Sequence, residues 1–274
     1  MRPFHRRRQD AENPFVNMTE SETTSPVHQP VTAAVLIIGN EILSGRTQDV
    51  NLKHIAEHMG RWGIRVKEAR VIPDIEEDIV DSLNQLRARY TYVFTTGGIG
   101  PTHDDITSEC IAKAFNRPLV IHPEIAELIQ SRPAPPEVMD SRMRMACVPE
   151  GATLVANPTG GPPGFCIENV YVMAGIPAVM QAMLGTLEPF LNRGEPVQSR
   201  SVTAFLGESQ IAAALGELQA RFHDIDLGSY PFFRENRYGT TLVMRGIDEA
   251  RLQAMLEGVK NIIIEAGETP VNIE

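Results

Sequence analysis

Hydrophobic and polar positions alternate along the chain in short apolar runs and helical stripes. The continuous apolar runs Ala33–Gly39 and Tyr92–Phe94 are typical of buried parallel strands. Apolar residues three to four positions apart predict helices over Asp49–Trp62 and Ser108–Phe115, and a further strand is predicted over Ile64–Ile72. Strands and helices thus follow one another in turn. This order predicts an α/β fold with a mostly parallel sheet and helices on both of its faces.

Local end signals place the boundaries of these elements. Asp74 is followed by a glutamate at the third residue along and by a helical stripe, so it is predicted to cap that helix. Thr107 is predicted to cap the helix over Ser108–Phe115. Asn40–Gly45 follows the first strand directly and is predicted to be a loop. Such a loop lies at the carboxyl edge of the sheet, where ligands of parallel sheets bind.

The rest of the chain shows a second, different pattern. Helices over Pro123–Ser131 and Glu137–Met145 and a helix after Pro177 continue the first part. A compact α+β unit then follows, with strands near 201–205, 226–232 and 240–245 and helices over 209–222 and 248–266. We therefore predict a disordered tail over 1–30, a main α/β domain over 31–191, a linker over 192–197 and a small α+β domain over 198–274.

Composition narrows the class of protein. The net charge of −10 disfavours non-specific nucleic-acid binding and adhesion to anionic membranes. The three cysteines are widely spaced and odd in number, which favours reduced thiols in a cytoplasmic protein. The first residues contain no apolar segment of the kind that secretory signals carry, and Met18 is an alternative start.

Candidate chemistry concentrates in the glycine-rich segment after the strand Tyr92–Phe94. Gly97, Gly98 and Gly100 allow the backbone to turn sharply and to approach a ligand. Exposed amides at such a turn, together with a helix N-terminus, favour an anion. Asp104 and Asp105 would repel that anion unless a cation lay between them, which points to a phosphate and Mg²⁺-type site. The alternative is a tight turn with aspartates that stabilise a helix N-terminus.

Two further loops are candidates for the same edge of the sheet. Asn157–Phe165 is rich in glycine and proline, and it is either the entry to a hairpin with arms Phe165–Ile167 and Tyr171–Met173 or a backbone wall of the site. Gly175 and Pro177 lie between a strand and a helix, where glycine permits close approach and proline suits the first helical turn.

These loops, taken in order, resemble a known family. The segment Thr96–Thr107 resembles the signature of the molybdopterin-binding MoaB/Mog fold, and it is most similar to the amino-terminal part of competence/damage-inducible protein A, CinA. Gly39–Gly45, Thr159–Phe165 and Gly175–Pro177 resemble the other loops of that group. Gly207–Ser209 and Gly228–Pro231 resemble its small following domain. The resemblance implies a three-layer α/β/α fold followed by a small KH-like domain.

The resemblance also implies a function. CinA-like domains are associated with metal-dependent hydrolysis of ADP-ribose and similar nucleotide pyrophosphates, a related domain of eukaryotic FAD synthase with FAD cleavage, and more distant relatives with adenylation of molybdopterin. We therefore expect Asp105 and Asp104 to be catalytic and, with Glu41, to hold Mg²⁺, Mn²⁺ or Co²⁺. The residues expected to bind phosphate or nucleotide are Thr96, Gly97, Gly98, Gly100, Thr107, Asn40, Glu41, Ser44, Gly164, Gly175 and Pro177.

Some features depart from the family pattern. His103 stands where a lysine or arginine is often found, and Ala174 stands where many relatives have proline. The chain lacks the deamidase domain of full-length CinA proteins, so that activity is expected to be absent. Two alternatives to the hydrolase are a molybdopterin-adenylating protein and a non-catalytic nucleotide or pterin sensor. The expected ligand is a small nucleotide or pterin, with no nucleic-acid or membrane partner, and we expect a homo-oligomer.

Overall fold

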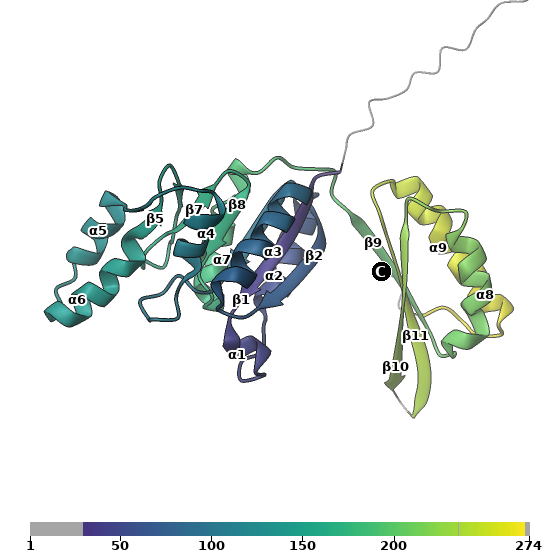
Figure 1. The fold of residues 1–274 in the computed structure, drawn as a ribbon. Helices are drawn as coiled ribbons and strands as arrows, with labels where there is room; N and C mark the ends of the chain where they lie inside the picture. Colours follow the sequence, from purple (N-terminus) through teal and green to yellow (C-terminus); the bar gives the residue numbers. More distant parts are fainter. Residues whose placement is uncertain (1–29, 235, 272–274) are drawn as a thin grey trace, which may run out of the picture.

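The main domain is built on a six-stranded sheet in the order β2-β1-β3-β8-β7-β6 (Figure 1). The computed structural model describes residues 30–234 and 236–271, so the predicted tail, apart from Pro30, and Met18 lie outside the described residues. The strands β2, β1, β3 and β8 run parallel, and β7 and β6 are antiparallel to their neighbours. The strands span β1 Thr32–Ile38, β2 Arg65–Ile72, β3 Tyr92–Thr96, β6 Thr153–Val155, β7 Gly164–Ile167 and β8 Val170–Met173. The predicted mostly parallel α/β fold is confirmed.

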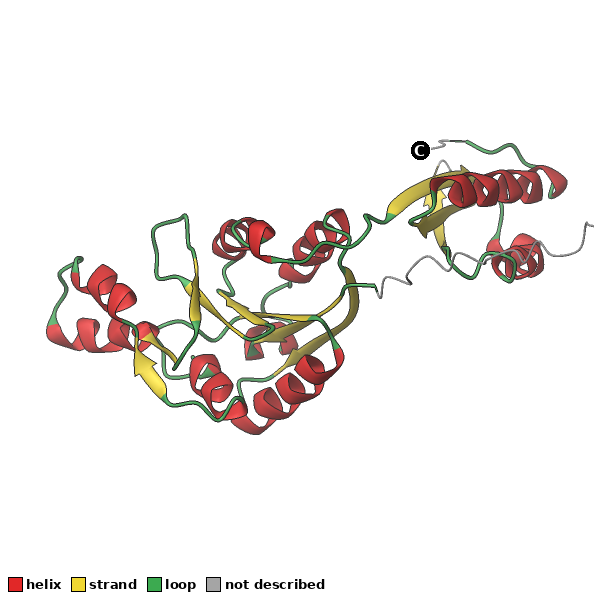
Figure 2. Cartoon of the chain, turned by 90° about the horizontal axis from the view of Figure 1, so that it is seen from above, coloured by secondary structure: helices red, strands yellow, loops and turns green. Residues whose placement is uncertain are grey.

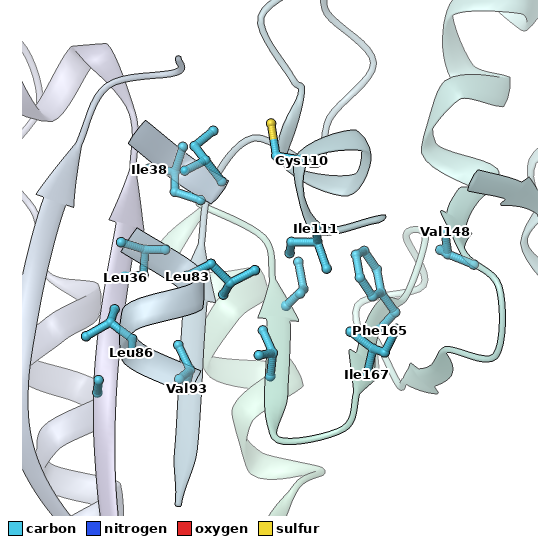
Figure 3. Close-up of a cluster of buried hydrophobic side chains, with 14 of the residues drawn as sticks. Leu36, Ile38, Leu83, Leu86, Val93, Cys110, Ile111, Val148, Phe165 and Ile167 are labelled. Atoms are coloured by element: carbon cyan, nitrogen blue, oxygen red, sulfur yellow. The ribbon is translucent and has the colours of Figure 1, made fainter. Parts of the chain in front are cut away.

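Helices cover both faces of this sheet because β1 sends alternate side chains to opposite sides. Its residues Ala34, Leu36 and Ile38 pack with α3 (Glu76–Arg89) and α4 (Thr107–Ala114) in one buried cluster (Figure 3). Its other residues pack with α2 (Asn51–Arg61) and α7 (Pro177–Gly185) in a second cluster. The domain therefore has three layers, as the family resemblance implied.

A small lobe projects from the main domain between α4 and β6 (Figure 1). It contains a two-stranded antiparallel sheet and a pair of short helices. Its elements are β4 Leu119–Ile121, α5 Pro123–Gln130, α6 Pro136–Met143, the 3₁₀ helix η1 Arg144–Ala146 and β5 Cys147–Pro149. The buried side chains of Ile125 and Ile129 join the same cluster as α3 and α4, so the lobe is anchored to the main core.

The C-terminal part forms a separate small domain with its own core. An antiparallel sheet in the order β10-β11-β9 is covered on one face by two helices (Figure 2). Its elements are β9 Gln198–Ala204, α8 Glu208–Gln219, β10 Asp226–Arg234, β11 Arg237–Gly246 and α9 Glu249–Glu265, and the 3₁₀ helix η2 Glu188–Phe190 precedes them. Along the described part of the chain, no helix is both long and apolar enough to cross a bilayer.

The structure corrects three local predictions. Asn40–Gly45 is not a plain loop, because Asn40–Leu43 forms the short helix α1. Asp74 does not cap α3, whose N-cap is Ile75, and its Oδ2 instead accepts a hydrogen bond from the Asn40 amide at 2.9 Å. Thr107 is the first residue of α4 rather than its cap. The side chains of Asp74 and Thr107 were both predicted to bond to a helix end, but each bonds instead to a residue farther away in the sequence, Asn40 and Gly97 respectively.

Candidate functional site

The glycine loop after β3 has a conformation that only glycine adopts easily. Gly97 and Gly98 have φ angles of +102° and +68°, in the left-handed region. A Cβ on Gly98 would lie 2.1 Å from Thr107 Oγ1, and one on Gly97 would lie 2.1 Å from Ile38 O. The Thr107 hydroxyl donates to Gly97 O and its amide donates to Gly98 O, each at 3.0 Å. The loop is therefore held rigidly against the start of α4.

A cavity of about 460 Å³ opens above this loop. The segment 97–101 and Asp105 form one side of it, the segment 157–163 a second, and residues around the β8–α7 connection a third. The lining residues are Gly97, Gly98, Ile99, Gly100, Pro101, Asp105, Met145, Asn157, Thr159, Gly161, Pro162, Pro163, Ala174, Gly175, Ile176, Val179 and Met183. The second glycine-rich loop leads into the β7–β8 hairpin, and its part 157–163 lines the cavity, whereas Gly164 and Phe165 do not.

The two adjacent aspartates share one threonine. Thr102 Oγ1 lies 2.6 Å from Asp104 Oδ1 and 2.5 Å from Asp105 Oδ2, and the Thr102 amide donates to Asp105 Oδ2 at 2.8 Å. One hydroxyl carries one proton and so can satisfy only one of the two carboxylates at a time. The Thr102 hydrogen bond is the main reason that the pKa of Asp104 is lowered below its ordinary value.

A guanidinium braces the same turn from the small lobe. Arg144 Nη1 donates to Thr102 O at 2.6 Å, and Nη2 donates to Asp105 O at 3.5 Å. Arg144 and Asp105 also line a narrow cavity of about 40 Å³ beside the main one. Arg144 thus holds this turn through its backbone carbonyls and not through its carboxylates. Among the described residues, the carboxylate of Asp105 forms no ion pair with an arginine.

The predicted three-carboxylate metal site does not assemble. Among residues 30–234 and 236–271, no group of three or more histidine, cysteine, aspartate or glutamate side chains could hold a metal ion. The Glu41 carboxylate folds back over Gly39, where an added Cβ would lie 2.6 Å from its oxygens. The Asp104–Asp105 pair remains. Two carboxylates fit a Mg²⁺-type ion that takes its other ligands from water and phosphate oxygens, and they do not fit an all-protein metal cage.

Several predicted binding residues lie outside the cavity lining. Asn40 and Ser44 belong to the α1 segment, where the Asn40 amide is held by Asp74 and the Ser44 hydroxyl donates to Glu41 O. Thr96 is 1% exposed at the end of β3, and its buried hydroxyl has no partner among the described residues.

The remaining predicted residues lie partly inside and partly outside the cavity lining. Gly175 and Ala174 line the cavity, whereas Pro177 begins α7 and does not. Gly164 is buried in β7, where an added Cβ would lie 2.1 Å from Val172 O, and the neighbouring Phe165 is 2% exposed. A ligand wall at Gly164–Phe165 is therefore incompatible with their burial. His103 is exposed and is not a lining residue, so its departure from the family pattern does not alter the cavity surface.

Asn51 is a residue of this site that the sequence interpretation missed. It is 5% exposed, and its Nδ2 donates to Gly175 O at 2.8 Å, which ties α2 to the cavity wall. Its Oδ1 is buried and has no partner among the described residues. Its position could have been recognised from the sequence spacing. Asn51 stands four residues before Ile55 and so lies on the buried face of α2, where a polar side chain needs a hydrogen-bond partner.

Comparison with known proteins identifies the families that the two parts of the chain resemble. Residues 34–193 match a family model described as a probable molybdopterin binding domain, and residues 196–268 match one described as the middle domain of FAD synthase. A protein of Archaeoglobus fulgidus is 36% identical over 199 residues, which cover 72% of this chain and 84% of that protein. A CinA-like protein of Gemmatimonas aurantiaca is 33% identical over 212 residues, which cover 72% of this chain and 50% of that protein.

A solved structure supports the same assignment. The protein CinA, described as of unknown function, from Thermoplasma acidophilum superposes with a TM-score of 0.54 at 30% identity, covering 58% of this chain and 98% of that one. The family match spans more than half of the chain and contains every loop that lines the cavity. The chain therefore belongs to the probable molybdopterin binding domain family, as a CinA-like protein of the MoaB/Mog fold.

Proposed function

We propose that this protein hydrolyses nucleotide pyrophosphates of the ADP-ribose or FAD type and releases AMP, with a divalent cation held at Asp105 and Asp104. The observation that carries the proposal is the cavity over Gly97–Pro101, which has backbone on one side and a carboxylate at its edge. Glycine backbone can approach a diphosphate closely, and its amides and the N-terminus of α4 attract negative charge.

The aspartates are suited to cation-assisted hydrolysis. A bound Mg²⁺, Mn²⁺ or Co²⁺ would neutralise phosphate charge and lower the pKa of water. Asp105 lies at the edge of the cavity and Asp104 is exposed beside it, so both carboxylates are accessible from solvent. The Thr102 hydrogen bonds and the Arg144 contacts to backbone carbonyls hold this turn in place before a ligand arrives, which limits reorganisation during the reaction.

The adenosine half has an apolar place to bind. Ile176, Val179 and Met183 form one side of the cavity, next to the Gly175 backbone. Ile176 is 66% exposed, so binding of a flat base against it would remove apolar surface from water. We assign the adenosine to this side and the diphosphate to the glycine loop.

The test is a substrate panel. The purified protein is incubated with ADP-ribose, FAD and NAD together with Mg²⁺, Mn²⁺ or Co²⁺, and AMP is measured by chromatography. We expect AMP release that falls at least about a hundredfold in Asp105→Asn, which preserves shape and removes the charge. The matched control is Asp81→Asn, which removes the charge of a carboxylate on α3 that does not line the cavity. No AMP above the Asp105→Asn level with any metal would refute the hydrolase.

A second candidate is favoured by the family match itself. Because residues 34–193 match a probable molybdopterin binding domain, the same cavity could bind a pterin, either to adenylate it or without catalysis. Consumption of ATP that depends on molybdopterin would support adenylation. Thermal stabilisation by nucleotide or pterin with no turnover of either would support a binding protein.

A further inference from the structure

A second cavity continues the first toward the small lobe. It has a volume of about 390 Å³ and shares the lining residues Met145 and Pro162 with the main cavity, so the two meet at these side chains. Its other walls come from α5, from the turn between α5 and α6, and from α6. A ligand that binds at the glycine loop can therefore extend past Met145 into this second space.

The chemistry of the second cavity differs from that of the first. Two guanidinium groups, those of Arg132 and Arg142, line it over a floor that includes Leu128 and Ile129. None of its lining residues in the described chain is acidic, and neither arginine forms an ion pair with a carboxylate among residues 30–234 and 236–271. In a chain with a net charge of −10, this is a local positive site beside the proposed diphosphate site.

The arginines are held in position by backbone contacts. Arg132 Nη2 donates to Gly160 O at 2.6 Å, next to Gly161, which lines the main cavity, and Arg142 Nη1 donates to Arg132 O at 3.4 Å. Pro133, Pro135 and Pro136 follow Arg132 and restrict the backbone of the turn. Each guanidinium has five N–H donors, so most of them remain available to a ligand.

We infer that this second cavity is an anion subsite that selects nucleotide diphosphates with a further phosphate on the half distal to adenosine. The inference rests on the proposed function, because it takes the diphosphate position from it. With adenosine beside Ile176 and the diphosphate at the glycine loop, the distal sugar points toward Met145 and the two arginines. Planar guanidinium groups match the geometry of a phosphate monoester, and the apolar floor suits the sugar ring.

The experiment compares two ligands that differ only at the distal end. Binding of ADP-ribose and of ADP-ribose 1″-phosphate is measured by calorimetry in EDTA and about 0.15 M salt, where the Debye length is about 8 Å. Chromatography of the same samples checks that both ligands stay intact. We expect the wild-type protein to bind the phosphorylated ligand about tenfold more tightly, which corresponds to about 1.4 kcal/mol.

The variants separate a ligand contact from a structural role. Arg142→Gln and Arg132→Gln should each reduce the affinity ratio, and the double variant should bring it close to one. If Arg132 merely braced Gly160, its loss would weaken both ligands equally and leave the ratio unchanged. Arg117→Gln, an exposed arginine that lines neither cavity, is the matched control and should retain the wild-type ratio.

The outcomes distinguish this inference from the proposed function. Equal affinity for the two ligands, or a ratio that survives in the double variant, overturns the anion subsite and leaves the hydrolase standing. A tenfold preference that the double variant abolishes, together with no AMP release in the substrate panel, supports the subsite and removes the hydrolase. Failure to bind either ligand overturns the anion subsite, whereas AMP release in the substrate panel, where a divalent cation is present, decides the hydrolase.

Discussion

Substitution of Gly98 by alanine tests whether the glycine loop is as tightly constrained as the structure indicates. Gly98 has a φ of +68°, and the left-handed conformation costs an alanine about 1–2 kcal/mol. The new Cβ would also lie 2.1 Å from Thr107 Oγ1 and 3.2 Å from Thr107 Cβ. Thr107 is fully buried, so it cannot move aside without loss of its hydrogen bond to Gly97 O.

The expected cost follows from these two terms. Loss of a buried hydrogen bond that leaves its partner unsatisfied costs about 1–3 kcal/mol. Added to the backbone term, Gly98→Ala should lower the free energy of unfolding of the main domain by about 2–5 kcal/mol. In a Thr107→Ala background the hydroxyl is already absent, so the same substitution should cost about 1–2 kcal/mol.

The assay uses a probe confined to the main domain. Trp62 is the only tryptophan in the sequence, is 8% exposed and packs in the cluster with Met59. Its fluorescence during urea unfolding therefore reports the main domain, separately from the small domain with its own core. Gly185→Ala, at the end of α7 with nothing within 4 Å of an added Cβ, is the control and should not be destabilised.

The double-variant cycle decides the interpretation. A coupling energy between Gly98→Ala and Thr107→Ala below about 0.5 kcal/mol is what independent sites show. That value, or a loss of less than about 1 kcal/mol in the single variant, would mean that the loop relaxes and that the close contact with Thr107 does not determine its shape.

The remaining predictions concern the groups around the cavity. Thr102→Val removes the hydrogen bond that lowers the pKa of Asp104, so carboxyl NMR should show that this pKa rises, and an unchanged titration would contradict the shared-hydroxyl geometry. Asn51→Leu removes the bond to Gly175 O and also a buried unpartnered oxygen, so we expect calorimetry to show weaker nucleotide binding, while urea unfolding changes by less than about 1 kcal/mol. Burial raises the pKa of Cys110 from 9.0 to about 12, so iodoacetamide at pH 8.5 should leave it unmodified by mass spectrometry. Because the unfolded thiol ionises near 9.0 and the folded one near 12, the stability that this thiol contributes is present below the lower pKa and falls as pH rises between the two values, which urea unfolding against pH will measure.

The sheet could be predicted because its signals are local. The apolar run of β1 and the apolar residues of β3 identify buried strands, and the stripes of α2 and α3 identify the faces that cover them. The β7–β8 hairpin was also recognisable from its two short arms. The parallel pairing of β8 with β3 was not, because no nearby residue records which distant strand a hairpin will join.

Polar side chains were harder to place than apolar ones, for a physical reason. Asp74 has the spacing of a helix cap, but the Asn40 amide, 34 residues earlier, binds its carboxylate instead. Arg144 reaches Thr102 over 42 residues, and Asn51 reaches Gly175 over 124. A hydrogen bond needs one donor and one acceptor in contact, so many sequence distances satisfy it equally well, whereas a core needs a repeating pattern.

Glycines are the exception, and they explain why the cavity could be anticipated when its polar anchors could not. A Cβ on Gly97 would collide with Ile38 O, and one on Gly175 would lie 3.2 Å from the Gly97 Cα. A side chain is excluded at Gly97 and would be crowded at Gly175, because another backbone segment lies against each position, so the need for glycine can be recognised from the residue itself. The ends of β1, β3 and β8 lie side by side because these strands are neighbours in the sheet, and the glycines allow the backbone after them to approach closely. A glycine after each of several parallel strands therefore predicts that their loops meet, even before any partner side chain is known.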